Sequence, residues 1–363
     1  MSFRFGLENF HPARDSGRIG MVTNITGVTL GLVQNVDYLR RNGANIVKIF
    51  SPEHGFYSTF ANGENVPDED YHGIPVRSLY KEDSKEMDVS ELDDIDTLIF
   101  DVQDAGVRFY TYLSTLYRVM EAAKKKSTSF MLLDRPNPLN SNTVSGPMLE
   151  PKYGSFVGID TIPVRYGMTI GELAHLFDRN IGAEPTIIRM TGYKRKAYYD
   201  ELVPSYIPIS WNLPTVDSVI NYSGMCLLES INASLGRGTP HPFSIVGFPG
   251  LWSLIKTEFP GIMMRETEFT PLLGPLKGRR VQGYYIHITD RRDYDPLSVW
   301  AGILYDLLES EKCELREDWI RLLYGSNRLL EARGRDAPFA ELVEGWADDL
   351  NEFLEIRSNH LIY

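Results

Sequence analysis

Cysteine is scarce in this chain of 363 residues, which holds only Cys226 and Cys313. Two cysteines are too few for a disulfide framework or a cysteine-based metal site, and they fit a reducing compartment. No stretch approaches the ~18 uninterrupted apolar residues that a membrane-spanning helix needs. Residues 1–8 also lack the apolar core of a secretion signal. We therefore expect a cytoplasmic protein that is not bound to a membrane.

Several familiar catalytic motifs are missing as well. The chain has no Gly-x-Gly-x-x-Gly after its first predicted strand, no phosphate-binding P-loop, no Gly-x-Ser-x-Gly turn and no His-Glu-x-x-His pair. Its seven histidines show no spacing typical of metal ligands. We therefore expect no cofactor. A Mg²⁺ site made only of the carboxylates of Asp101, Asp104 and Asp134 stays open as an alternative.

Positive charge is also in short supply. The chain holds 37 lysines and arginines against 49 aspartates and glutamates, which gives a net charge of −12. An acidic chain repels phosphate backbones, and its densest basic runs, 124–126 and 194–196, are short. We expect no nucleic-acid partner. Apolar residues make up 43% and charged residues 24%, as in globular proteins, and the length favours two domains.

In the first half of the chain, short apolar runs alternate with helical patterns. This alternation predicts an α/β fold with a parallel sheet, and the unbroken apolar character of each run indicates that both faces of the sheet are covered. A segment rich in Pro, Asn, Ser and Gly, 136–151, is predicted to be a long loop. The predicted strands are 19–23, 45–50, 96–101 and 130–134.

Prolines at 204, 208 and 214 interrupt the pattern in the middle of the chain. We place the domain boundary there, which gives one domain at 1–198 and a second at 199–363. The second part holds an alternating strand pattern at 284–289 and helical patterns at 297–309 and 339–356. The sequence does not report an oligomeric state.

Polar side chains follow each of the four predicted strands. Ligands of open parallel sheets bind at the carboxyl ends of the strands, so the shared pattern predicts a functional site at that edge. We expect substrate contacts from Asn24, Asp134, Arg135 and Asn137, which belong to these groups. The groups themselves are 23–24, 51–55, 101–104 and 134–138.

Glu53 and His54 are the leading catalytic candidates. Pro52 and Gly55 flank them at the end of a predicted strand, where a carboxylate can be held rigidly. A general acid needs such positioning and a pKa raised by partial burial. The alternative is that Glu53 caps the following segment and that His54 lies in a surface loop.

The third predicted strand supplies a second acidic group. Asp101 and Asp104 flank a turn, and either is a candidate for a second catalytic carboxylate or for an acceptor of sugar hydroxyls. Arg108 follows, and it is equally compatible with a structural Asp–Arg pair. Tyr110 and Tyr112 are candidates for stacking on a sugar ring, or they pack the helix.

In the second half, Glu229 follows an apolar run and lies at the edge of a buried element. Gly-Arg-Gly at 236–238 puts Arg237 on a flexible backbone, as a clamp for a carboxylate requires. Trp211 and Asn212 are expected to form an aromatic and polar wall. Asn232 completes the predicted substrate-binding set.

These segments together resemble the exo-β-N-acetylmuramidase (NamZ) family, glycoside hydrolase family 171, formerly a domain family of unknown function. The resemblance extends over nearly the whole chain, and the strings Ser-Pro-Glu-His-Gly-Phe and Arg-Phe-Tyr-Thr-Tyr are its most specific parts. The segments that carry it are 20–28, 50–56, 100–112, 133–138, 165–173 and 287–290.

The resemblance implies a Rossmann-like N-terminal domain, a smaller α/β C-terminal domain and a site in the cleft between them. It also implies release of terminal N-acetylmuramic acid from peptidoglycan fragments, with Glu53 as the leading catalytic carboxylate and a small carbohydrate as substrate. The chain departs from the family pattern at 209–214 and 229–232, where contacts to the sugar are expected to differ. A related acidic amino sugar therefore stays open, with Arg237, Arg108 or Arg135 on its carboxylate.

Two chemical routes follow for a glycosidase. In one, a second carboxylate (Asp101, Asp104 or Glu229) acts opposite Glu53, and the separation of the two decides between retention and inversion. In the other, the N-acetyl group of the substrate replaces the second carboxylate. A non-catalytic sugar-binding protein and a metal-dependent hydrolase are the rival hypotheses.

Overall fold

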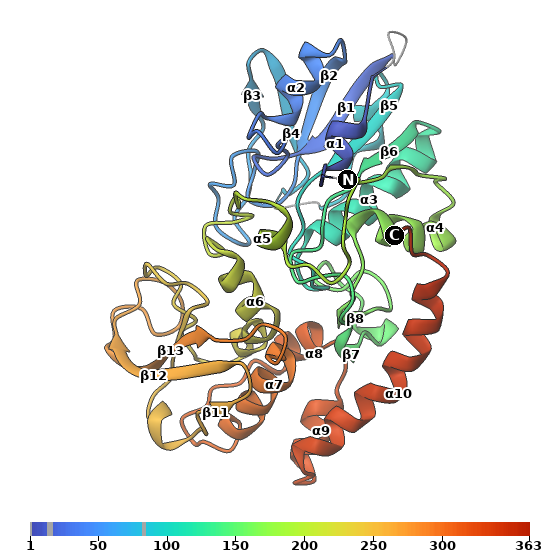
Figure 1. Ribbon diagram of the computed structural model, residues 1–363. Coiled ribbons are helices and arrows are strands. Elements are labelled where there is room, and N and C mark those ends of the chain that lie inside the picture. The colour runs from blue at the N-terminus through green and yellow to red at the C-terminus, as the bar shows by residue number, and fades with distance from the viewer. Residues whose placement is uncertain (1, 13–16, 82–84) are drawn as a thin grey trace.

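The computed structural model describes residues 2–12, 17–81 and 85–363. Its main layer is a seven-stranded sheet in the order β3-β4-β2-β1-β5-β6-β9 (Figure 1). All neighbours in this sheet are parallel except β3, which runs antiparallel to β4. The strands are β1 Arg18–Thr23, β2 Asn45–Ser51, β3 Glu69–Tyr71, β4 Ile74–Ser78, β5 Thr97–Asp101, β6 Ser129–Leu133 and β9 Thr186–Ile188.

The four strands predicted from apolar runs are all in this sheet, as β1, β2, β5 and β6. Most of their interior residues are buried because helices pack against the sheet, which explains why the runs are mainly apolar without alternation. The main helices here are α2 Asn35–Arg41, α3 Tyr112–Lys126 and α4 Ile170–Ile181. In α4, Thr169 and Glu172 form the capping box that their spacing predicts.

Since β2 lies on one side of β1 and β5 on the other, the chain reverses its direction of strand addition at β1. Loops at the carboxyl ends of the strands on either side of such a point diverge and leave a crevice. The register puts Thr23 of β1 opposite Asp101 of β5, and Val22 opposite Phe50 of β2, so these strand ends lie at one edge.

Composition predicts a long loop at 136–151, but this segment is not a simple loop. It contains β7 Ser145–Met148, which pairs antiparallel with β8 Pro163–Arg165. Pro147 and Gly146 stand inside β7, and such residues are unfavourable in strands, which explains why composition missed it. A two-stranded ribbon with few ladder bonds tolerates both.

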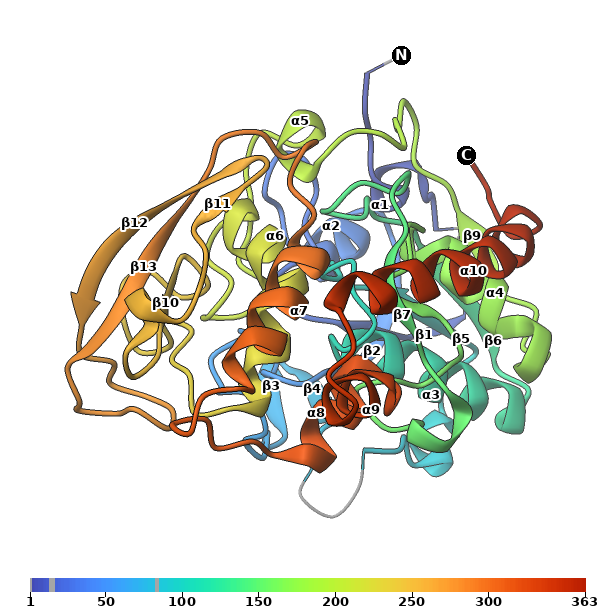
Figure 2. The ribbon, with the colours of Figure 1, turned by 90° about the horizontal axis from the view of Figure 1, so that it is seen from below.

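The smaller C-terminal domain is built on an antiparallel four-stranded sheet in the order β10-β13-β12-β11. The helices α6 and α7 pack against each other beside it (Figure 2). The strand predicted at 284–289 is β13. The bounds are α6 Val216–Met225, β10 Ile245–Gly247, β11 Glu258–Phe259, β12 Ile262–Phe269, β13 Val281–Ile288 and α7 Pro296–Leu307.

The last helix, α10 Phe339–Ser358, leads back to the first domain, and the chain ends beside α4 (Figure 1). Arg357 donates to the carbonyl of Gly167, and the Tyr363 hydroxyl donates to Asp134 at 2.7 Å. The boundary at 198/199 stays a prediction. The remaining elements are α1 Gly6–Asn9, α5 Tyr199–Leu202, α8 Glu317–Tyr324, α9 Arg328–Gly334 and the short 3₁₀ turns Val89–Leu92, Pro151–Tyr153, Cys226–Ser230 and Leu251–Ser253.

Within the described parts of the chain, no helix is both long enough and apolar enough to cross a membrane.

Candidate active site

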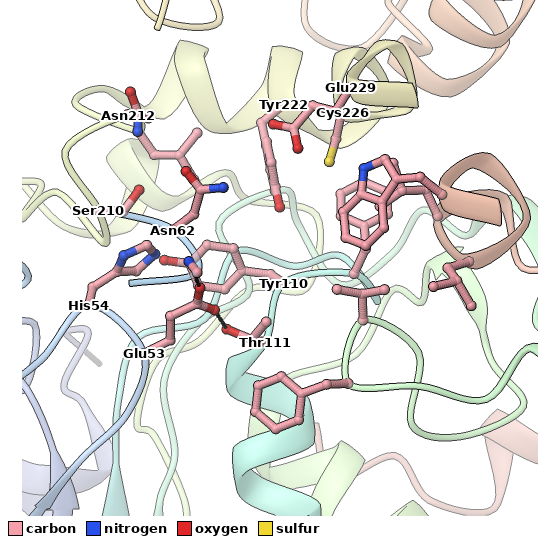
Figure 3. A pocket seen from close by; sticks show the side chains of 18 of the residues that line it. Glu53, His54, Asn62, Tyr110, Thr111, Ser210, Asn212, Tyr222, Cys226 and Glu229 are labelled. Carbon is pink, nitrogen blue, oxygen red and sulfur yellow. Dashed lines mark hydrogen bonds between the residues drawn. The ribbon is translucent and has the colours of Figure 1, made fainter. Parts of the chain in front are cut away.

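A cavity of about 320 Å³ lies where loops from the carboxyl edge of the parallel sheet meet α6, α8 and neighbouring loops (Figure 3). Its first wall comes from the loops that follow β2, β4 and β5, and its second wall from the C-terminal half of the chain. Its residues include Glu53, His54, Asn62, Tyr80, Lys85, Tyr110 and Thr111 on the first wall, and Asn212, Tyr222, Cys226, Glu229, Arg237 and Phe243 on the second.

Glu53 is the first carboxylate of the cavity, and three neutral donors surround it. The backbone N–H of Gly63 donates to its Oε1 at 2.8 Å, and the Thr111 hydroxyl donates to its Oε2 at 2.5 Å. The Tyr80 hydroxyl also bonds to this carboxylate; burial, and then the charge of Glu53, raise the pKa of Tyr80. Glu53 is only 5% exposed. Among the described residues, no cation forms an ion pair with this carboxylate, and neutral donors orient it.

His54 follows Glu53 in a left-handed backbone conformation, with φ of 73°. Non-glycine residues rarely adopt it, and the cost of such a conformation is ~1–3 kcal/mol. Its Nδ1 lies 2.8 Å from the carbonyl of Phe60 and donates to it, because a carbonyl can only accept. Burial lowers the pKa of His54, against the opposing charge of Glu53. Nε2 of the neutral ring is then an acceptor.

Glu229 is the second carboxylate of the cavity, on the wall opposite Glu53 (Figure 3). It differs from Glu53 because Arg237 binds it: both Nε, at 3.1 Å, and a terminal nitrogen of Arg237 donate to its Oε1. Arg237 also reaches Asn62 on the first wall at 3.3 Å and stacks over the ring of Phe243. The ion pair thus bridges the two walls.

Aromatic rings and a thiol line the space between the two carboxylates. Tyr110 lines the cavity and donates to the carbonyl of Ile209 at 3.0 Å, which fixes the position of its ring. Burial raises the pKa of Tyr222 and of Cys226 well above their usual values, so both stay neutral. Rings of this kind suit the apolar faces of a sugar.

The structure brings six of the sixteen predicted site residues to this cavity: Glu53, His54, Tyr110, Asn212, Glu229 and Arg237. The other ten do not line it, and all of them except the exposed Trp211 make contacts within the fold that sequence spacing does not reveal. They are Asn24, Asp101, Asp104, Arg108, Tyr112, Asp134, Arg135, Asn137, Trp211 and Asn232.

Asp101 and Arg135 form a buried ion pair instead of facing the cavity. Arg135 Nε lies 2.5 Å from Asp101 Oδ1, and a second nitrogen donates to Oδ2 at 3.1 Å. Asn35 adds a third donor, and the guanidinium lies over the ring of Phe5. Both partners are about 1% exposed or less, so neither is free to meet a substrate.

Asp134 and Asp104 are buried in separate networks. Asp134 accepts from the Thr169 hydroxyl and the Gly171 N–H, both at 2.8 Å, besides Tyr363, and burial raises its pKa to about 7. Asp104 accepts from Tyr166 and from the backbone of its own turn, and burial raises its pKa to about 6. The acidic edge predicted from the sequence is thus divided among three networks.

Arg108 is fully buried and has no acidic partner within the described residues. It donates to backbone carbonyls of Pro147, Ile162 and Leu323, the last at the C-terminal end of α8, and burial lowers its pKa to about 9. The partial negative charge of a helix C-terminus suits a cation there. Arg108 therefore joins the first domain to α8 rather than binding substrate.

The remaining five residues are structural or peripheral. Asn24 donates to the Tyr112 hydroxyl at 2.8 Å, and Tyr112 in turn approaches the carbonyl of Glu53. Asn137 donates to the carbonyl of Met168. Asn232 bonds to the backbone at 312 and 314. Trp211 is 70% exposed and lies outside the cavity, although its neighbours Ser210 and Asn212 line it.

No group of three or more His, Cys, Asp or Glu residues could hold a metal ion among the described residues. The carboxylates that the sequence offered for Mg²⁺ accept from arginine, hydroxyl and N–H donors instead. Donor sets of that kind leave few oxygen lone pairs for a cation.

Sequence reasoning missed Thr111, Tyr80 and Lys85. Thr111 stands between the two predicted tyrosines, and its hydroxyl is the group that reaches Glu53. Tyr80 and Lys85 follow β4, a short parallel strand next to β2. The alternation in Ile74, Val76 and Ser78 was the available signal, and the proline between the first two obscured it.

Comparison with known proteins gives a consistent result over almost the whole chain. Residues 19–217 match the sequence model of the N-terminal domain of exo-beta-N-acetylmuramidase NamZ, and residues 220–363 match that of its C-terminal domain. The peptidoglycan beta-N-acetylmuramidase NamZ of Bacillus subtilis (strain 168) is 35% identical over an alignment of 360 residues, and the match covers 95% of this chain and 87% of that protein.

Two crystal structures share the fold. Both are DUF1343-family proteins of Bacteroides fragilis NCTC 9343, with TM-scores of 0.87 and 0.81 at 27% and 28% identity. The matches cover 99% and 100% of this chain and 99% of each of the other two chains. On these matches, the chain belongs to the exo-β-N-acetylmuramidase NamZ family.

Proposed function

We propose that this protein is an exo-acting β-N-acetylmuramidase, which releases terminal N-acetylmuramic acid or a closely related acidic amino sugar from peptidoglycan-derived fragments. The observation that carries the proposal is Glu53, a buried carboxylate that three neutral donors hold at the wall of a cavity in a chain of this family. The cavity, about 320 Å³, is at the small end of ligand pockets, which suits one terminal sugar.

In this proposal, Glu53 is the general acid. A glycosidic bond breaks when an acid gives its proton to the leaving oxygen as the anomeric carbon gains positive charge. Thr111, Gly63 and Tyr80 fix the carboxyl group, so the acid needs little reorganisation when substrate binds. His54, which lines the cavity beside it as a neutral ring, would accept a hydrogen bond from a substrate hydroxyl or a water.

The acetamido group of the substrate is the best candidate for the second catalytic group. Asp101 and Asp104 lie outside the cavity, which leaves Glu229 as the other carboxylate on its described lining. Two nitrogens of Arg237 bind Glu229, and such a pair weakens a carboxylate as nucleophile or base. The acetamido oxygen would attack the anomeric carbon while Glu53 protonates the leaving oxygen. Water then opens the cyclic intermediate.

The experiment is hydrolysis of a chromogenic β-N-acetylmuramic acid glycoside, compared with the N-acetylglucosamine analogue. Glu53→Gln should lower the rate by ~10²–10⁴, since that is the usual contribution of a general acid. Glu344→Gln makes the same chemical change at an exposed position on α10 and serves as the matched control. Turnover that survives in Glu53→Gln would remove Glu53 from the reaction.

Glu229→Gln separates the two routes. The acetamido route predicts a decrease of less than about tenfold, because Glu229 then only holds Arg237. A decrease as large as that of Glu53→Gln would instead establish the two-carboxylate route. A non-catalytic sugar-binding protein would give no turnover with either glycoside and unchanged sugar affinity in Glu53→Gln. The cytoplasmic location expected from the sequence stays a prediction, which cell fractionation would test.

A further inference from the structure

An enzyme that selects N-acetylmuramic acid needs a feature that N-acetylglucosamine does not engage. The two sugars differ in the lactyl ether on C3 of muramic acid, which adds one carboxylate. A cation on the cavity wall is the direct way to recognise this group, since ion-assisted hydrogen bonds to carboxylates are the strong ones. To bind the lactyl carboxylate, such a cation must line the cavity and must not already be paired with a carboxylate of the protein.

Two cationic side chains line the described part of the cavity, Arg237 and Lys85. Arg237 is already neutralised, because two of its nitrogens bind Glu229 and a third reaches Asn62. A substrate carboxylate would have to displace Glu229 to use it. Arg108 and Arg135, the other arginines that the sequence suggested for this task, are buried elsewhere.

Lys85 differs from Arg237 in this respect. No described carboxylate forms an ion pair with it, and its side chain is exposed at the cavity. Its Nζ lies 4.6 Å from the centre of the Tyr80 ring and 5.5 Å from that of Phe156, so the ammonium lies over two aromatic faces. Cation–π contacts of this kind stabilise the ammonium modestly and do not neutralise its charge.

Tyr80 connects Lys85 to the proposed chemistry. The hydroxyl of this ring bonds to Glu53, while its face carries the ammonium of Lys85. One side chain therefore spans from the proposed acid to a cation that pairs with no carboxylate of the described residues. In the sugar, C3 is separated from the anomeric carbon by C2 alone, so the scissile bond and the lactyl group project from neighbouring parts of one ring.

We propose that Lys85 is the specificity-determining residue of the cavity and binds the lactyl carboxylate of the muramic acid unit. The inference rests on the proposed function and adds the group that distinguishes its substrate. The ammonium of lysine is a mobile point charge on a flexible stem, which suits a carboxylate on a rotatable ether better than a rigid fork would.

The test compares wild type, Lys85→Met and Lys85→Arg on the muramic acid and glucosamine glycosides. Lys85→Met should lower kcat/KM for the muramic acid glycoside about tenfold, mainly through KM, which corresponds to ~1.4 kcal/mol of binding. Its kcat/KM for the glucosamine glycoside should not change. Lys85→Arg should restore most of the loss, because it retains the positive charge.

Lys81→Met is the matched control. Lys81 lies four residues earlier, pairs with Asp68 at 3.2 Å and does not line the cavity, so its removal should leave the preference for muramic acid as in wild type. The proposal would be overturned if Lys85→Met kept the wild-type preference for the muramic acid glycoside. It would also be overturned if Arg237→Gln lost this preference and Lys85→Met did not.

Calorimetric binding of free N-acetylmuramic acid and N-acetylglucosamine to Glu53→Gln, with and without Lys85→Met, gives a readout that needs no turnover. Binding that prefers muramic acid and needs Lys85, in a protein without turnover, would support the specificity residue while refuting the hydrolase. Turnover with a preference that ignores Lys85 would refute the specificity residue alone. Absence of both turnover and binding would overturn both.

Discussion

The end of β2 and the ends of β5 and β6 differ in where they direct their carboxylates. At the end of β2, Glu53 faces a cavity and accepts only neutral donors. At the ends of β5 and β6, Asp101 and Asp134 are fully buried, the first in an ion pair and the second among hydroxyl and N–H donors. All three follow parallel strands of one sheet at the same edge.

This difference teaches that a polar strand end indicates the edge of the sheet but not the role of the residue. A buried carboxylate is stable only when donors or a cation compensate the lost hydration, so Asp101 and Asp134 depend on partners from distant parts of the chain. Glu53 lines the cavity, and the loop at 61–64 brings it a neutral donor, the Gly63 N–H. Mutations should therefore separate activity from stability.

The largest effect on stability is expected for Asp101→Ala. Removing Asp101 leaves Arg135 charged and buried, and breaking such a pair from one side costs ~3–5 kcal/mol. Chemical denaturation would measure this loss in the free energy of unfolding. The kcat of the folded fraction should stay near that of wild type, because neither residue lines the cavity.

Glu53→Gln is expected to show the reverse of Asp101→Ala, with a loss of activity but little change in stability. Its free energy of unfolding should change by less than about 1 kcal/mol, since glutamine keeps an oxygen for the Gly63 N–H or the Thr111 hydroxyl. The comparison would fail if Asp101→Ala lost kcat while remaining fully folded. It would fail equally if Glu53→Gln unfolded as readily as Asp101→Ala.

A loss of stability is also expected for Gly106→Ala, in the turn after β5. Gly106 has φ of 82°, and a Cβ there would lie 2.3 Å from the Asn137 Oδ1. The backbone strain costs ~1–3 kcal/mol and the overlap adds ~1–3 kcal/mol. Gly43→Ala is the matched control, because Gly43 has φ of 93° but open space around its Cα. Equal losses in the two variants would mean that the contact with Asn137 contributes nothing.

The parallel sheet and the position of Glu53 at the cavity could be anticipated because their signals are local. Four apolar runs identify β1, β2, β5 and β6, and Pro52 and Gly55 mark the turn that carries Glu53. By contrast, nothing near Asp101 indicates that it is buried, since its partners Arg135 and Asn35 are 34 and 66 residues away. Sequence spacing alone does not distinguish a carboxylate that lines a cavity from one that forms a buried ion pair with an arginine.

The opposite wall of the cavity was harder to predict for a related reason. Glu229 and Arg237 were both chosen as substrate contacts, and both line the cavity, but their mutual ion pair changes what each can do. Lys85 was not singled out because it follows β4, whose position beside β2 is a tertiary fact. Its two aromatic neighbours come from the segment after β4 and from residue 156, and no sequence pattern connects these.

For Asp104→Asn, the expected effect on stability depends on pH. Burial raises the pKa of Asp104 in the folded protein to about 6, above the unfolded value of 3.8. Between pH ~4 and ~6 the folded state therefore binds the extra proton, and wild type loses stability as the pH rises through this window.

Asparagine keeps an acceptor for Gly106 and Tyr166 but does not ionise, so the difference in unfolding free energy between Asp104→Asn and wild type should grow in favour of the variant from pH 4 to 6. Above pH 6 it should level off at no more than ~3 kcal/mol, since each pKa unit corresponds to 1.36 kcal/mol. Asp348→Asn, at an exposed site on α10, is the matched control. A difference that did not vary with pH would mean that Asp104 ionises alike in the folded and the unfolded state.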